Sequence, residues 1–146
     1  GGGLVEIQVL NQAASSKVAN SSTTAFGSTG ENIVIAGFLL GGHNGDDRII
    51  VRGIGPSLAA LGVPGALADP TLQLRDANGA LLLSNNNWQD NPAQAAELIA
   101  HGLAPSNPLE SGIVATLPPG LYTALLAGLN NGTGIGLVEV YDRGGP

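Results

Sequence analysis

Cysteine and methionine are both absent from this 146-residue chain, and aromatic residues make up only 3% of it. Without cysteine there is no disulfide, no thiol chemistry and no cysteine-ligated metal. Without methionine there is no initiator residue, so we expect a processed or excised product. Because aromatic residues are so few, the core has to be built from valine, isoleucine, leucine and alanine.

Charge is also scarce. Charged residues account for 11% of the chain, and only five of them are lysine or arginine, which gives a net charge of −6. Five cations cannot form a basic patch, so nucleic acid is not an expected partner. No apolar run approaches the roughly 18 residues of a membrane span, so we expect no membrane insertion. A polar but uncharged surface is common in secreted proteins, and we expect an extracellular or cell-surface location.

The chain contains 23 glycines and 9 prolines, spread among apolar segments. This pattern indicates short strands joined by tight turns, and the expected fold is all-β: an antiparallel β-sandwich or jelly roll with one or two short helices. Residues 76–79, Asp-Ala-Asn-Gly, predict a hairpin turn. Residues 31–40 and 48–54 predict a second hairpin, and the alanine-rich residues 92–101 predict a helix that ends at Gly102.

One strand occurs almost twice. Residues 3–9 read Gly-Leu-Val-Glu-Ile-Gln-Val and residues 136–142 read Gly-Leu-Val-Glu-Val-Tyr-Asp. Either both copies lie in one sandwich as similar strands, or the first copy completes a neighbouring unit. We therefore divide the chain into an N-terminal junction strand and linker, residues 1–16, and a β-sandwich domain, residues 17–146. We expect Val5, Ile7 and Val9 to share one buried face.

The second alternative implies assembly with other copies of the chain, as a head-to-tail homopolymer or as neighbouring repeats, because strand addition between units gives an open filament. The residues expected at such a seam come from both copies of the strand: Leu4, Val5, Glu6, Ile7, Val9, Leu137, Val138 and Val140.

Two resemblances accompany these patterns. Residues 69–74, 76–79, 84–87 and 117–123 resemble the bacterial pre-peptidase C-terminal domain, a jelly-roll sandwich of exported enzymes. Residues 19–23, 51–58, 62–70 and 137–142 resemble a tandem β-sandwich repeat of large secreted bacterial surface proteins. In that repeat the Leu-Val-Glu-Val strand closes one unit and a strand rich in asparagine, serine and threonine follows it. The resemblance implies a structural extracellular protein, a subunit or repeat of a surface filament or array.

No pattern predicts catalysis. The two histidines, His43 and His101, stand in no recognisable motif, and Ser57 lacks the nucleophile-elbow pattern. We therefore expect that the chain is not an enzyme and has no catalytic residue.

A calcium ion is the one cofactor that the residues suggest. Calcium takes six to eight oxygen ligands from a flexible loop. Oxygen-bearing side chains gather around the 76–79 turn and the loop after it, and the pre-peptidase resemblance implies calcium in the same region. The alternative is turn chemistry without an ion. The candidate ligands are Asp69, Asp76, Asn78, Asn85 and Asp90.

The alternative function is an extracellular carbohydrate- or ligand-binding module. Trp88, in a loop with Asn86 and Asn87, is the candidate sugar platform, although a lone tryptophan also commonly plugs a core edge. Asn20 and Asn131 begin glycosylation sequons.

Overall fold

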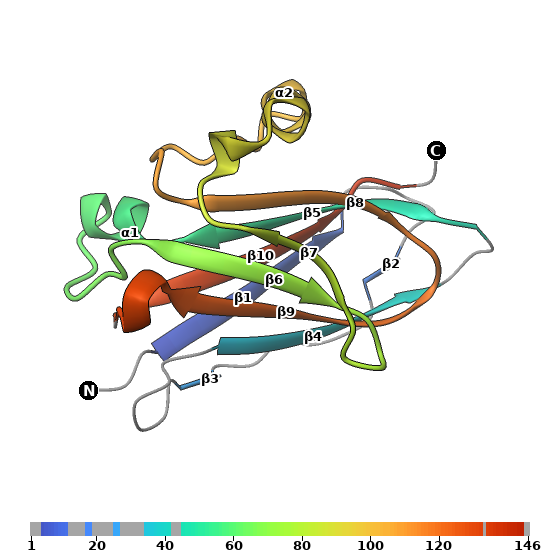
Figure 1. Cartoon of the computed structure of the whole chain (residues 1–146), viewed down its shortest axis with the longest axis horizontal. Coiled ribbons are helices and arrows are strands. Elements are labelled where there is room, and N and C mark those ends of the chain that lie inside the picture. The colour runs from blue at the N-terminus through green and yellow to red at the C-terminus, as the bar shows by residue number, and fades with distance from the viewer. Residues whose placement is uncertain are drawn as a thin grey trace.

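Two five-stranded sheets pack face to face in the part of the chain that the computed structural model describes, residues 4–11, 17–18, 25–26, 34–41, 45–132 and 134–144 (Figure 1). All neighbouring strands are antiparallel except one pair, so the predicted antiparallel sandwich is confirmed. In spatial order the first sheet contains β3 (Ala25–Phe26), β1 (Leu4–Asn11), β10 (Gly136–Asp142), β5 (Asp47–Ile54) and β8 (Ser111–Leu117). The second contains β2 (Lys17–Val18), β4 (Val34–Gly41), β9 (Gly120–Gly128), β6 (Pro70–Arg75) and β7 (Leu81–Asn85).

The main core lies between the sheets and is aliphatic, as the composition predicts. Alternate residues of β6 point inward, so that Leu72 and Leu74 pack in the same cluster as Ile113 of β8, and all three are at most 1% exposed. The main aromatic contact in this core is a stack of Phe38 on Tyr122, with ring centroids 5.7 Å apart.

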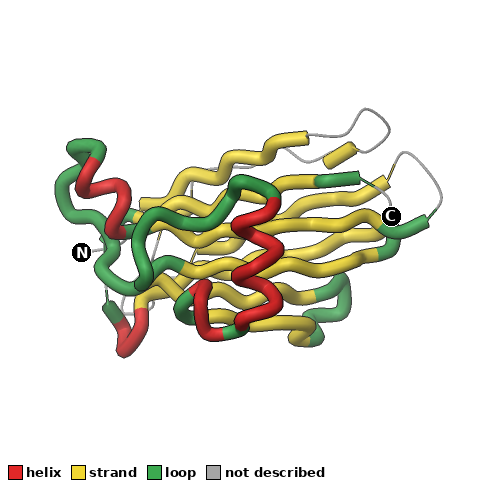
Figure 2. Tube along the Cα trace, turned by 90° about the horizontal axis from the view of Figure 1, so that it is seen from above, coloured by secondary structure: helices red, strands yellow, loops and turns green. Residues whose placement is uncertain are grey.

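A second, smaller core covers the outer face of the first sheet. The helix α2 (Pro92–Ala100) crosses the strands there, as Figure 2 shows, and Leu98 packs with Ile50, Val114 and Tyr141. Gly112 permits the close approach, because a Cβ atom at that position would stand 2.7 Å from Cδ1 of Leu98. Within the described residues, no helix is long and apolar enough to cross a membrane.

The predicted helix over 92–101 is confirmed as α2, and Gly102 follows it as predicted. The Asn91 side chain accepts hydrogen bonds from the N–H groups of Ala93 and Gln94, Pro92 occupies the first turn, and Gly102 adopts a φ of +71° after the last turn. The remaining helical segments are short: α1 (Pro56–Ala60), the 3₁₀ turn η1 (Trp88–Asp90) and the 3₁₀ turn η2 (Leu129–Asn131).

One predicted hairpin is confirmed and the other is wrong. The Asp76 carboxylate accepts hydrogen bonds from the Asn78 and Ala80 N–H groups, and Gly79 has a φ of +80°, so β6 and β7 form the predicted hairpin. In contrast, β4 and β5 lie in different sheets: β4 pairs with β9 and β5 pairs with β10 and β8. Both strands are apolar enough to sit centrally, so each takes two partners that cover its edges and the chain crosses between the sheets.

A buried carboxylate holds the segment after β5. Glu110 is fully buried, and its Oε2 accepts the N–H groups of Gly55 at 2.9 Å and Ser57 at 2.8 Å, while its Oε1 accepts the Ser57 hydroxyl at 2.6 Å. Gly55 cannot carry a side chain, because a Cβ atom there would stand 2.3 Å from the Leu67 carbonyl oxygen. The Gly-Pro-Ser motif is therefore a structural anchor for the start of α1.

We expect Glu110→Ala to lower the free energy of unfolding by about 3 kcal/mol, because it leaves two N–H donors without an acceptor in a buried site. Glu110→Gln should cost less, since its amide oxygen can still accept. Urea unfolding of the three proteins measures the difference. An alanine variant as stable as the wild type would contradict the anchoring role.

Candidate functional site

The two copies of the repeated strand are neighbours in the same sheet. β1 and β10 run parallel and pair over seven residue pairs, from Val5 with Gly136 to Asn11 with Asp142. Of the two arrangements that the sequence allows, the structure therefore has both copies in one sandwich. β1 is also integrated in the first sheet, with β3 on its other side over two residue pairs.

The register keeps the two copies in phase. Ile7 lies beside Val138 and Val9 beside Val140, so the residues expected on one face occupy sheet positions next to valines that are fully buried in the main core. Glu6 lies beside Leu137 on the alternate positions. The predicted seam residues are thus brought together, within one chain.

On the outer face of the first sheet, β10 is bound to β5 by a shielded ion pair. The guanidinium of Arg52 donates through Nε and Nη2 to one oxygen of Glu139, and it also donates to the Leu103 carbonyl oxygen at 3.2 Å. Its carbon lies 5.4 Å from the centre of the Tyr141 ring. Burial raises the pKa of Tyr141 above its ordinary value. These contacts fix β10 against β5 and leave its opposite edge to β1.

The far edge of the same sheet is closed by side chains. β8 is the last strand, and its outward N–H groups at Gly112 and Val114 donate to Oδ1 of Asn85 at 2.9 Å and to Oε1 of Gln94 at 2.6 Å. An open strand edge is a template for further strands, so these two amides protect β8 from strand addition over this stretch.

The five candidate calcium ligands do not converge on one point. Asp69 precedes the six-residue strand β6 and Asp76 follows it, so about 20 Å separates the two at the usual rise per residue. Asp76 and its neighbour Asn78 belong to the hairpin turn, where the carboxylate is used by backbone N–H groups. Asn85 is used by Gly112, and Asp90 accepts the Asn87 N–H at 3.2 Å. As one five-residue site, the calcium prediction is wrong.

Unpartnered oxygens do occur at one end of β6 and β7. Oδ1 of Asp69, Asn86 and Asn87 is buried in each case, with no hydrogen-bond partner among the described residues. Burial raises the pKa of the Asp69 carboxyl group. The described part of the chain contains no group of three acidic or histidine side chains that could hold a metal. Asp69 with these two amides is what remains of the calcium hypothesis.

Trp88 is 8% exposed and packs with Leu98 in the smaller core. A buried ring cannot stack on a sugar, so the expected platform is absent at this position and Trp88 instead plugs the core below α2. Its loop is held by the N–H of Trp88, which donates to the Glu110 carbonyl oxygen at 2.8 Å.

The remaining residues considered in the sequence analysis lie away from β6, β7 and Trp88 or outside the described residues. Asn131 ends η2, while Asn20 and His43 lie outside the described residues. His101 follows α2 with Nε2 3.7 Å from Glu97, whose pKa is lowered mainly by its hydrogen bond with Arg48.

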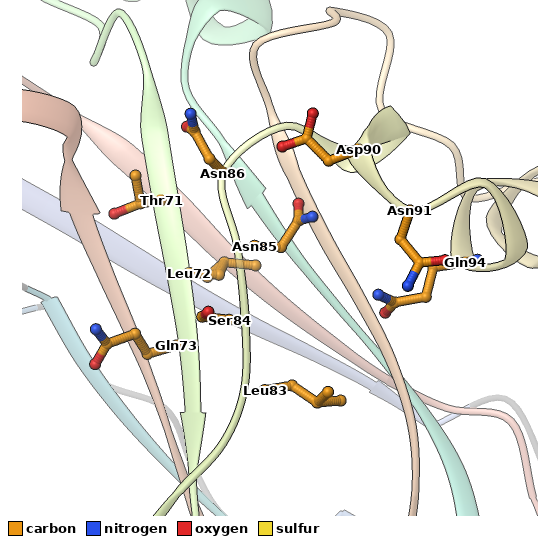
Figure 3. A pocket seen from close by; sticks show the side chains of 10 residues that line it. All are labelled: Thr71, Leu72, Gln73, Leu83, Ser84, Asn85, Asn86, Asp90, Asn91 and Gln94. Atoms are coloured by element: carbon orange, nitrogen blue, oxygen red, sulfur yellow. Dashed lines mark hydrogen bonds between the residues drawn. The ribbon is translucent and has the colours of Figure 1, made fainter.

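A cleft of about 460 Å³ opens between the β6–β7 hairpin and the segment from η1 to α2 (Figure 3). The sequence patterns point to Asn85, Asn86 and Asp90 of this lining but not to Ser84, Asn91 and Gln94. Asn91 could have been found from the sequence, because it stands at the N-cap position of the predicted helix. Nothing in the local sequence pattern indicates that Gln94 lines the same cleft as β7.

No protein-family model and no curated protein sequence matches the chain. Among solved structures the chain is similar to the pre-peptidase C-terminal domain of a collagenase from Bacillus anthracis, with 10% identity and a TM-score of 0.40 over 92% of this chain and 94% of that one. At that similarity the collagenase domain carries no information on activity, ligands or assembly, and the sandwich rests on the strands described above.

We expect Asp69→Asn to raise the melting temperature by a few degrees at pH 7 in the presence of a chelator, because it removes a carboxylate whose ionisation is penalised by burial. A raised carboxyl pKa means that the folded state holds the proton more tightly, so the penalty grows as the pH rises through the folded pKa. The gain should therefore vanish below about pH 4.

The exposed Asp46 offers a matched control, and Asp46→Asn should leave the melting temperature unchanged. A less stable Asp69→Asn variant in chelator would contradict the expectation. A calcium-dependent stabilisation of the wild type that the variant lacks would identify Asp69 as a ligand.

Proposed function

We propose that the chain is a structural subunit or repeat of an extracellular bacterial surface filament or array, assembled head to tail by strand addition. In the assembled form β1 of one unit would occupy the place beside β10 of the next. The observation that carries the proposal is the β1–β10 pairing, which joins the first and last strands over seven residue pairs.

Exchange between units is favoured by the identity of the contacts. A β1 strand from a neighbour makes the same backbone hydrogen bonds as the chain's own β1, so the closed and exchanged forms differ mainly in linker strain and in the entropy of association. Among the described residues, β3 pairs with the other edge of β1 over two residue pairs. The exchanged element is therefore a single strand that can leave without dismantling the second sheet.

The parallel orientation supports a linear assembly. Because β1 and β10 run the same way, both strands begin at one end of the sandwich and finish at the opposite end (Figure 1). Units joined through these ends follow one another along the strand axis. A heterologous contact of this kind gives an open filament when its rotation does not close a ring.

The closed edge of β8 supports strand addition at β10 rather than at β8. With Asn85 and Gln94 bonded to its outward N–H groups, β8 offers a poor template for a foreign strand. The edge of β10 is then the favoured place for strand addition in the first sheet. The low content of charged residues, 11%, and the resemblance to secreted tandem repeats support the extracellular setting.

Cysteine trapping tests this proposal cleanly, because the chain has no cysteine of its own. Glu6 and Leu137 are register partners on parallel strands, so their Cα atoms lie about 4.8 Å apart, within the range that a disulfide spans. We expect a mixture of the single variants Glu6→Cys and Leu137→Cys to form disulfide-linked dimers on mild oxidation, and the double variant to form ladders.

Thr116→Cys is the control partner, since Thr116 is exposed on β8, away from the seam. Its mixture with Glu6→Cys should give only background cross-linking. A double variant that yields cross-linked monomers at every concentration, together with mixtures no more dimeric than the control, would rule out exchange.

A further inference from the structure

The polar cleft between the β6–β7 hairpin and α2 has no part in the proposed assembly and suggests a second function. The cleft lies between β7 and the start of α2, near β8. In the first sheet, β1 lies toward the edge opposite to β8, so the cleft and the proposed seam are separate. Its volume of about 460 Å³ falls in the range of small-molecule sites. Figure 3 shows the side chains of Asn85, Asn91 and Gln94 in the space between β7 and α2.

Two amide groups in the cleft are held in fixed orientations by the backbone. Oε1 of Gln94 accepts the Val114 N–H at 2.6 Å, and Oδ1 of Asn91 accepts the N–H groups of Ala93 at 3.0 Å and Gln94 at 3.1 Å. With each carbonyl oxygen committed, the orientation of each NH₂ group is set as well. No hydrogen bond within the described residues uses either NH₂ group, so both remain as pre-positioned donors.

Acceptors lie on the same walls. The Asp90 carboxylate uses one oxygen for the Asn87 N–H, at 3.2 Å, and no described donor engages the other. The exposed Ser84 adds a hydroxyl group to the lining, which can both accept and donate. Leu83 adds an apolar surface to the lining.

This lining selects the chemical class of the ligand. No lysine, arginine or histidine lines the cleft, so an anion has no counter-charge there. A single carboxylate beside amide NH₂ groups is unsuited to calcium or magnesium, which take oxygen ligands. Donors and acceptors together with an apolar side chain match the hydroxyl groups and the C–H face of a sugar ring.

We propose that this cleft binds a neutral sugar, of one or two rings. The Gln94 and Asn91 NH₂ groups donate to its hydroxyl oxygens, and Asp90 and the Ser84 hydroxyl accept from its hydroxyl groups. The site does not involve Trp88, which is buried in the smaller core.

Two conservative variants test the donors without disturbing the fold. Gln94→Glu and Asn91→Asp keep the oxygen that accepts from the backbone, so the β8 edge and the helix cap survive, but each replaces the NH₂ donor by an oxygen. Gln89→Glu is the matched control, because Gln89 is exposed on η1 and does not line the cleft.

The full-length chain is titrated, with amide chemical shifts observed by NMR, against glucose, galactose, mannose, N-acetylglucosamine, maltose and cellobiose at about 10 mM, a concentration that reveals millimolar binding. We expect at least one sugar to shift the signals of the cleft residues. Its affinity should fall about tenfold in each cleft variant and stay unchanged in Gln89→Glu.

Three results would overturn the proposal: no shift with any of these sugars, shifts located elsewhere, or equal affinity in the cleft variants. Calcium chloride provides a further arm, because both cleft substitutions add a carboxylate. Calcium-induced shifts at the cleft in the wild type, strengthened in these variants and without sugar binding, would assign the cleft to a cation instead. The cysteine-trapping result is independent of every one of these outcomes.

Discussion

The structure depends on pairing both edges of β10. Val138 and Val140 of this strand are fully buried in the main core, while Glu139 and Tyr141 on its other face bind Arg52. β5 covers one edge and β1 covers the other. Without β1, a row of unpaired N–H and C=O groups would border the most buried side chains of the sheet. Some strand has to pair with this edge of β10. The backbone hydrogen bonds are the same whether that strand comes from the same chain or from the next.

The opposite edge of the sheet, at β8, is covered by side chains instead of by a strand. β8 ends the sheet, and the side chains of Asn85 and Gln94 hold its outward N–H groups at Gly112 and Val114. The same contacts orient the free end of Gln94 toward the cleft. The Gln94 side-chain amide thus has two roles. Its oxygen blocks strand pairing at β8, and its NH₂ group is left to donate to a ligand, because an amide that accepts through its oxygen presents its NH₂ group elsewhere.

Local chemistry explains which elements could be predicted. The 76–79 turn and α2 carry their own signals, because the Asp76 carboxylate, Gly79 and the Asn91 cap act within a few residues of one another. Strand partners are decided by distant residues, so the predicted pairing of β4 with β5 failed and the neighbours of β1 stayed open between two alternatives. Candidate ligands near in sequence were separated by the length of β6, and Trp88 was buried by the fold of α2 over the sheet. The cleft escaped prediction for the same reason, since Gln94 meets Val114 of β8 only through tertiary structure.

Self-complementation within one chain and exchange along a filament are two outcomes of the same β1–β10 contact. Electron microscopy of the full-length chain across a concentration series distinguishes them most directly. The proposed exchange predicts filaments whose axial repeat is one sandwich and in which β1 density connects successive units beside β10. Particles that stay single sandwiches at the highest concentration, with β1 density continuous with the rest of its own unit, would contradict it.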